Sequence, residues 1–486
     1  MTARQDTFPF NPDQSAALLR RASKQWDADI LPQLIDYVKL PAKSPSFDAE
    51  WKRTGQIQRA IEQAQKFVAA QPVKNMTLEV ITLEGRTPVM FFDIPGTGTK
   101  TTGKTVLLYG HLDKQPEMAG WRDDLGPWTP LIEDGKLYGR GSADDGYAVF
   151  SALAAITALD AENISRPRCL GLIETCEESG SFDLPPYLDA LAPRMGDVGL
   201  VVALDSGAGN YDQLWATTSL RGMVSGVMTV RMLTEGVHSG DAGGVVPSTF
   251  RIARQLLDRI DDSTTGITKS TVFNAPIPEE RVAQAKQATE ILGESMWKRF
   301  PWQSCGGAHE FTLPTSKDPV ELILNRTWRA SLSIVGADGL PSTKDAGNVL
   351  RPFTALKLSL RIPPTVNGDE AVAEVKRLVE KDTPYNAQVS FVGGGATGWN
   401  APAFAPWLTV ALDAASMHFF GRPAAYMGEG GTIPFMSMLG AKFPDAQMLV
   451  TGVLGPKSNA HGPNEFLHIE YAKKVTAATA LVISAA

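Results

Sequence analysis

The stretch from Thr105 to Gly146 reads TVLLYGHLDKQPEMAGWRDDLGPWTPLIEDGKLYGRGSADDG. It opens with an apolar, β-prone run, Thr105–Tyr109, which predicts a strand that ends just before His111 and Asp113. Ligands of open α/β sheets collect at the carboxyl ends of the strands. His111 is therefore a candidate metal ligand, and Asp113 could accept the hydrogen bond that fixes the tautomer of its ring. The alternative is a simple hydrogen-bonded pair at the end of a strand.

The same stretch closes with a glycine-rich turn, Gly139–Gly146, that surrounds the adjacent carboxylates Asp144 and Asp145. An apolar helical run, Tyr147–Leu159, follows directly. Glycines at such a turn indicate that the backbone lies close to something buried. The turn therefore offers a second metal ligand on a loop next to His111, or alternatively a helix N-cap.

Size and composition narrow the class of protein. The chain has 486 residues, enough for two or three domains, with 43% hydrophobic residues, 20% charged residues and a net charge of -7. There is no basic stripe that would favour nucleic acid. The three cysteines form no CxxC pair, the first residues lack a signal-peptide core, and no apolar run is long enough to span a bilayer. These features predict a cytoplasmic protein without a membrane partner.

Strands and helices alternate along the first 218 residues. Two amphipathic helices open the chain, two strands follow, and strand–helix alternation then favours a layered α/β domain. The predicted helices are Asp13–Val38, Ile57–Ala70, Tyr147–Leu159 and Leu184–Leu191, and the predicted strands are Leu78–Leu83, Pro88–Ile94, Thr105–Tyr109, Cys169–Glu174 and Val198–Leu204.

A different pattern of elements begins near Ser219 and ends near Gly395. It predicts an inserted α+β domain over residues 219–395, with a hinge at Gly393–Gly395. The α/β pattern resumes over residues 396–486, so the first domain would be discontinuous. The predicted strands of the insert are Val224–Met232, Ser331–Val335, Leu356–Ile362 and Gln388–Val392, and its helices are Pro247–Ile260 and Asp369–Lys381.

Further polar clusters follow the predicted strands, and they complete a candidate metal centre. Together His111, Asp144, Glu178, Asp205 and His461 supply two imidazoles and three carboxylates. This set suits two divalent ions that share one carboxylate, with zinc the first choice and manganese or cobalt next. Two such ions can hold a hydroxide between them and polarise a carbonyl group.

Glu177 precedes the candidate ligand Glu178 and could take the proton of the attacking water. Each of these residues has a simpler interpretation: Glu177 and Glu178 as a solvated charge pair, Asp205 as a turn former, His461 as a structural residue. Their coincidence at the strand ends of one predicted sheet favours the metal centre. His309, His418 and His468 lie in no such cluster and are predicted to be structural.

Eight segments, in order along the chain, resemble the motifs of the dinuclear zinc peptidases that include carnosine dipeptidases, bacterial dipeptidases, aminoacylases and carboxypeptidase G. They are GHLDKQP, DGKLYGRGSADD, ETCEESGS, ALDSG, VHSGDAGG, LSLRIPP, GEGGTIP and NAHGPNE. The resemblance implies an α/β catalytic domain with a central mixed sheet, interrupted by an inserted α+β lid that closes over the site and forms a homodimer.

The resemblance also implies individual roles. His111, Asp144 and Asp205 would bind one ion, and Asp144, Glu178 and His461 the other, with a cis peptide after Asp144. Glu177 would be the general acid/base and Asp113 the partner of His111. His238 would reach the scissile carbonyl across the dimer, unless it only caps a turn. The positions that would bind substrate are Asn348, Arg361, Glu429 and Thr432, with Arg361 suited to gripping a carboxylate unless it is a surface strand residue.

Two departures from the family pattern stand out. Gly146 and Tyr147 follow Asp145 where the family commonly has Lys-Gly, so a structural role of that lysine is unfilled. Gly393–Gly395 stands where carnosine-type relatives often carry a histidine that touches substrate. The substrate is therefore expected to differ from theirs.

The leading functional hypothesis is a metal-dependent hydrolase of dipeptides or short peptides, because Asp rather than Glu at position 205 resembles the dipeptidase side of the family. An N-acyl-amino-acid amidohydrolase is the first alternative. A non-catalytic metal-binding protein is disfavoured because Glu177 is retained, and a serine hydrolase is disfavoured because no GxSxG motif occurs.

Overall fold

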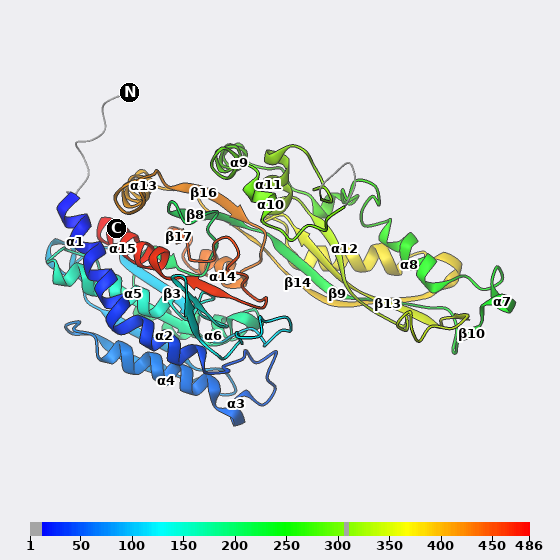
Figure 1. The fold of residues 1–486 in the computed structure, drawn as a ribbon, viewed down its shortest axis with the longest axis horizontal. Coiled ribbons are helices and arrows are strands. Elements are labelled where there is room, and N and C mark those ends of the chain that lie inside the picture. The colour runs from blue at the N-terminus through cyan, green and yellow to red at the C-terminus, as the bar shows by residue number, and fades with distance from the viewer. Residues whose placement is uncertain (1–11, 306–310) are drawn as a thin grey trace.

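The computed structural model describes residues 12–305 and 311–486, and Figure 1 shows an elongated molecule with a bulky part and a narrower arm. The bulky part contains a six-stranded sheet between layers of helices. The arm contains a four-stranded sheet. His309 lies outside the described residues.

The six-stranded sheet is mixed, as predicted. Its order is β1-β2-β6-β3-β7-β17, in which β3 runs parallel to both β6 and β7, and β17 runs parallel to β7. Strands β1 and β2 complete it in antiparallel pairs. The four parallel strands therefore end at one edge. The strands are β1 Thr77–Ile81, β2 Val89–Ile94, β3 Thr105–His111, β6 Cys169–Glu174, β7 Val198–Ala203 and β17 Gln447–Val450.

Both faces of this sheet are buried. Along β3, Val106 and Leu108 pack into one hydrophobic cluster and Leu107 and Tyr109 into another. A continuous apolar run is typical of a strand covered on both faces. The first face is covered by α1 Pro12–Gln25, η1 Trp26–Ile30, α2 Leu31–Val38, α4 Gln56–Ala69, α5 Ala148–Ala161, α13 Pro406–Phe420 and α15 Ile469–Ala485, and the second by α6 Leu184–Met195 and α14 Pro434–Lys442.

The sheet of the arm is antiparallel, in the order β11-β13-β9-β14. One face packs on helices α8 and α12, and the small β10–β12 pair with α7 lies at the far end of the arm (Figure 1). The predicted fold class, a layered α/β part with an inserted α+β unit, is confirmed. The elements are β9 Gly222–Arg231, β10 Val237–His238, α7 Ser239–Ala242, α8 Thr249–Leu257, β11 Ser331–Asp338, β12 Val349–Leu350, β13 Phe353–Ile362, α12 Gly368–Glu380 and β14 Gln388–Ala396.

The predicted hinge at Gly393–Gly395 is wrong. All three glycines lie within β14 and pair with β9, with Gly393 opposite Gly226. A Cβ at Gly393 would lie 2.3 Å from the main-chain oxygen of Ser225 and 2.5 Å from the Cα of Gly226. Glycine is therefore present at this position because two backbones approach closely.

Two three-stranded sheets and several further helices lie in the rest of the described residues. Helices α9 and α11 contribute Ala285, Ala288, Ile323 and Leu324 to the cluster that covers the first face of the central sheet. The domain boundaries at 218 and 395 stay a prediction. These elements are β4 Leu131–Glu133, β5 Lys136–Tyr138 and β18 Phe466–His468; β8 Trp215–Leu220, β15 Trp399–Asn400 and β16 Ala425–Glu429; and α9 Glu279–Leu292, α10 Ser295–Lys298 and α11 Pro319–Thr327, with the short α3 Trp51–Thr54.

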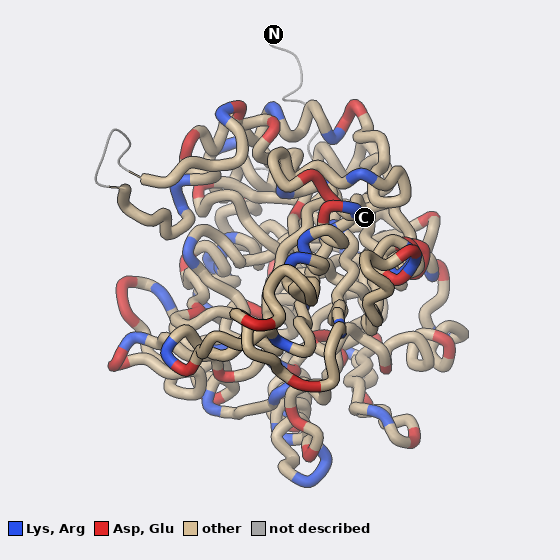
Figure 2. The backbone as a smooth tube through the Cα atoms, turned by 90° about the vertical axis from the view of Figure 1, so that its right-hand side faces the viewer, with Lys and Arg blue, Asp and Glu red and all other residues tan. Residues whose placement is uncertain are grey.

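Charged residues of both signs are interspersed along the backbone in the view down the arm (Figure 2). Across residues 12–305 and 311–486, no helix is both long enough and apolar enough to cross a bilayer.

Candidate active site

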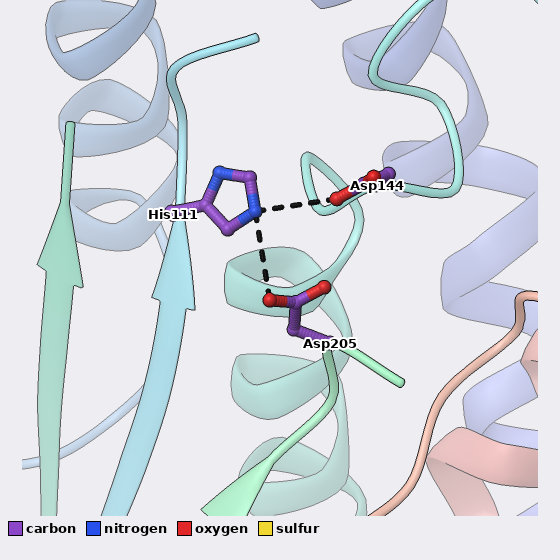
Figure 3. Close-up of side chains that lie close together, drawn as sticks. All are labelled: His111, Asp144 and Asp205. Carbon is purple, nitrogen blue, oxygen red and sulfur yellow. Dashed lines mark ion pairs between the residues drawn. The ribbon is translucent and has the colours of Figure 1, made fainter. Parts of the chain in front are cut away.

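Three of the predicted ligands meet at the carboxyl edge of the central sheet (Figure 3). His111 ends β3, Asp205 follows β7, and Asp144 lies in the turn before α5. The Nε2 atom of His111 lies 3.3 Å from Oδ1 of Asp144 and 3.7 Å from Oδ2 of Asp205. All three residues are buried, and Nε2 makes no hydrogen bond. A buried imidazole nitrogen without a partner, facing two carboxylates, fits a cation between them.

A second group shares Asp144 with the first. The Nε2 atom of His461 lies 3.0 Å from Oδ2 of Asp144 and 3.3 Å from Oε2 of Glu178. The two oxygens of Asp144 thus face two different imidazoles. In each group the potential ligand atoms lie within 4.8 Å of one another. The structure therefore brings all five predicted ligands together, and the peptide bond between Asp144 and Asp145 is cis, as the resemblance implies.

The electrostatics of this cluster favour a bound cation. Burial raises the pKa of Glu177, Glu178 and Asp205, and neighbouring carboxylates raise it further. Burial alone would lower the pKa of His111, but the neighbouring carboxylates of Asp113, Asp144 and Asp205 outweigh it and raise the pKa well above its ordinary value. A divalent ion would neutralise these crowded carboxylates and reverse the preference for their protonated forms.

Asp113 contacts both the His111 ring and the loop that carries Glu177 and Glu178. The Nδ1 atom of His111 lies 3.1 Å from the main-chain oxygen of Asp113 and 3.5 Å from its Oδ1. The Asp113 carboxylate also accepts hydrogen bonds from the main-chain N–H groups of Glu177 and Glu178, at 3.1 and 3.0 Å. An N–H at Nδ1 leaves the Nε2 lone pair directed at the two carboxylates. Asp113 therefore orients both the ring and the loop that carries Glu178.

Glu177 is buried at the mouth of the cluster, with Oε2 3.9 Å from Nε2 of His111. It borders two cavities, of about 460 and 600 Å³, which we call the first and second cavity. Thr432 and His461 border both cavities too. Glu177 is therefore placed where a substrate spanning the two cavities would pass.

Arg361 and Thr432 lie together, and Arg361 Nη1 donates to Thr432 Oγ1 at 2.7 Å. Arg361 lines the second cavity, where Gly394 also lies with open space around its Cα position. Glu429 lies in the first cavity, in an ion pair with Arg326. Three of the four predicted substrate positions therefore border the cavities.

His238 and Asn348 border neither cavity. His238 belongs to β10 at the end of the arm, and the neighbouring Ser239 N–H donates to the main-chain oxygen of Asn348 at 2.9 Å. The Nδ1 atom of His238 accepts a hydrogen bond from Gly240 N–H and caps α7, which was the alternative interpretation. Within one chain, these two residues are separate from the cluster.

An ion pair that the sequence interpretation missed connects two loops of the cluster. Glu465 Oε1 accepts hydrogen bonds from the main-chain N–H groups of Gly141, Ala143 and Asp144, at 3.0, 3.3 and 3.4 Å. Its Oε2 lies 2.7 Å from Nη1 of Arg140, and both side chains are fully buried. Both residues lie within the quoted motifs, but nothing in their spacing along the chain indicates that they pair.

The space beside Gly146 explains the missing lysine. A Cβ at Gly146 would lie 2.0 Å from Cε1 of Tyr37, so no side chain fits at that position. The buried Lys114 packs against Gly141 of the same turn, and its Nζ donates to the main-chain oxygens of Tyr37 and Leu40, at 2.8 and 2.9 Å. Tyr37 and Lys114 thus support the turn that carries Asp144.

Fold and cluster together define a class: an α/β protein with two groups of metal-type ligands that share one carboxylate at the edge of a mixed sheet. Residues 107–485 match the model of peptidase family M20/M25/M40, and the chain belongs to that family. The predicted class of enzyme, a peptidase-family hydrolase, is confirmed.

Known relatives agree with this assignment. The chain is 27% identical to cysteinylglycine-S-conjugate dipeptidase of Corynebacterium striatum, over 76% of this chain and 79% of the relative. It is 27% identical to human Beta-Ala-His dipeptidase, over 70% of this chain and 67% of the relative. The solved structure of the di-peptidase Dug1p from Saccharomyces cerevisiae shares the fold, with a TM-score of 0.74 at 22% identity over 97% of this chain and 98% of that chain.

Proposed function

We propose that this protein is a metal-dependent dipeptidase that works with two divalent ions, zinc in the first place and manganese or cobalt as alternatives. The observation that carries the proposal is Asp144, whose two carboxylate oxygens face His111 and His461 in two adjoining ligand groups. The dipeptidase names of two relatives support the substrate class.

The five ligands divide between two ions. His111, Asp144 and Asp205 would hold one, and Asp144, Glu178 and His461 the other. When bound, such ions polarise a carbonyl group and acidify water. Asp113 keeps His111 in the tautomer that presents Nε2.

Glu177 acts as the proton carrier of the reaction. Its carboxylate takes a proton from the attacking water and returns it to the nitrogen of the departing amine. A buried glutamate beside the ligands has no purpose in a protein that only binds metal.

Arg361 is the substrate anchor of the second cavity. Its guanidinium, held by Thr432 Oγ1, can grip the carboxylate at the carboxyl end of a dipeptide. An N-acyl amino acid carries the same carboxylate, so an N-acyl-amino-acid amidohydrolase is the second candidate function. The absence of a side chain at Gly394 leaves room for substrates unlike those of carnosine-type relatives.

His238 and Asn348 are assigned to a homodimer that forms through the arm. His238 is exposed at the end of the arm, and in one chain it borders neither cavity. A partner's site is where such a ring could donate a hydrogen bond to the oxyanion. We place the enzyme in the cytoplasm, in keeping with its unpaired cysteines.

The test combines metal analysis with two sets of substrates. The purified protein is expected to hold close to two divalent ions per chain and to hydrolyse dipeptides faster than N-acetyl amino acids. Faster hydrolysis of N-acetyl amino acids would favour the second candidate. Hydrolysis of neither set by the metal-loaded protein would refute the proposal.

A further inference from the structure

Basic residues form part of the wall of the first cavity, which also includes metal ligands. The residues that line the cavity include Asp205 and Glu177, and also Arg299, Arg326 and Lys457. Arg299 directly follows α10, and Arg326 lies within α11. None of these three basic residues belongs to the motifs quoted above.

The charges on this wall do not balance. Arg326 forms an ion pair with Glu429, and both side chains are largely buried, at 20% and 18% exposure. In the part of the chain that the structure describes, Arg299 forms no ion pair or hydrogen bond through its guanidinium, which lies 5.1 Å from the ring centroid of Phe300. Burial and the neighbouring Arg326 lower the pKa of Arg299 to about 10, and the Glu429 carboxylate only partly opposes this shift. A half-buried guanidinium without an acceptor in the protein is free to donate hydrogen bonds to an anion.

The position of Arg361 sets the direction in which a substrate would lie. Arg361 lines the second cavity, whereas Arg299 lines the first, and Glu177, Thr432 and His461 border both. With the carboxyl end of the substrate on Arg361 and the scissile bond near Glu177, the amino-side part extends into the first cavity. A volume of about 460 Å³ has room for a side chain there.

We propose that Arg299 selects substrates whose amino-side part carries a carboxylate. The orientation rests on the proposed function, but the basic wall is independent of it. The carboxylate can come from an aspartate or glutamate residue at the amino end of a dipeptide, or from a dicarboxylic acyl group on an N-acyl amino acid. Both present the same planar anion, to which a guanidinium can donate two parallel hydrogen bonds.

The experiment compares substrates that differ only in this charge. The dipeptide pair is Glu-Ala and Gln-Ala, and the acyl pair is N-succinyl-alanine and N-butanoyl-alanine. We expect kcat/KM to favour the charged member of the hydrolysed pair by about 10-fold or more, as for a charge-assisted hydrogen bond. Arg299→Met should bring this ratio close to one, and Arg299→Lys should restore part of it.

Lys298→Met is the matched control, because it removes the same charge from the neighbouring residue. Lys298 is 57% exposed, pairs with Glu294 and does not line the first cavity, so this variant should keep the wild-type ratio. Equal kcat/KM values for charged and neutral substrates in the wild type would overturn the proposal. An Arg299→Met ratio equal to that of the wild type would overturn it too.

A binding measurement separates this proposal from the proposed function. Calorimetry with metal-loaded Glu177→Gln protein gives the affinities for Glu-Ala and Gln-Ala without turnover. Suppose that the wild type hydrolyses neither substrate pair, but that Glu-Ala binds more tightly than Gln-Ala and Arg299→Met removes this difference. The proposed function then fails and the anion site stands. Equal binding of the two dipeptides would refute the anion site while leaving the proposed function intact.

Discussion

The edge of the central sheet and the end of the arm both carry residues assigned to one reaction, but only the edge brings its residues together. At the edge, parallel strands β3 and β7 end side by side, and the loops that follow them meet the turn before α5. At the end of the arm, the two-residue strands β10 and β12 display His238 away from both cavities. A parallel sheet can therefore assemble a site within one chain, whereas an arm can complete a site only where another surface meets it.

Substitution of Asp144 is expected to have the largest effect on the site at the edge of the central sheet. Asp144→Ala should remove both metal ions and all measurable activity, because its two oxygens face both imidazoles. Metal content per chain, measured on purified protein, is the readout. The control is Asp183→Ala, which removes a buried carboxylate that binds Arg86 and Thr87 outside the cluster and should keep the metal. Retention of nearly two ions by Asp144→Ala would show that Asp144 is not shared.

Glu177→Gln is expected to have the next largest effect. The variant should keep both ions and lose turnover by about 10²–10⁴-fold, the usual share of a general acid/base. Steady-state kinetics measures the turnover, and metal analysis on the same sample measures the number of ions retained. Glu178→Gln is the matched comparison, because it should lose metal as well as activity. Near-normal turnover in metal-replete Glu177→Gln protein would contradict the assignment.

The sequence predicted the edge well because strand ends are local features. The apolar run before His111 and the run before Asp205 each indicate a buried strand, and the carboxyl ends of parallel strands meet. Glu465 could not be found in this way, because its hydrogen bonds reach main-chain groups more than 300 positions away in the sequence. The glycines of β14 led to the wrong prediction of a hinge. Gly393 is needed because β14 and β9 approach closely there, and the sequence of β14 alone does not show this contact.

Mixing two inactive variants tests whether the end of the arm takes part in the reaction. His238→Ala should reduce turnover by about 10²–10³-fold, as expected for loss of an oxyanion donor. Hybrid dimers formed with Glu177→Gln should regain activity, because one of their two sites receives a native Glu177 and the partner's native histidine. Activity after mixing and subunit exchange is the measurement.

Asp241→Ala, at the neighbouring α7, is the control for general damage to the end of the arm and should remain active. Hybrids no more active than either parent would argue that His238 serves its own chain or takes no part. A fully active monomer in solution would lead to the same conclusion.

The smallest expected effect concerns the support of the edge. Glu465→Gln should weaken metal affinity by about 10–100-fold, the usual effect of losing a residue that orients a ligand. Glu465, in the loop of His461, accepts hydrogen bonds from three main-chain N–H groups of the turn that carries Asp144. Arg140, in that turn, donates through Nη2 to the main-chain oxygen of Gly462 at 2.8 Å. These contacts hold the two ligand-bearing loops together. Competition with a chelator measures the affinity, and turnover at saturating metal should change much less.

Breaking a buried ion pair also destabilises a protein, by about 3–5 kcal/mol, so the test needs an ion pair elsewhere whose arginine is equally buried. Arg166 is fully buried and pairs with Asp160 at 2.8 Å, outside the cluster. Asp160→Asn should lower the melting temperature and leave metal affinity unchanged. If both variants weaken metal binding equally, Glu465 acts through overall stability. If only Glu465→Gln does, the metal site depends on an ion pair that holds its two loops together.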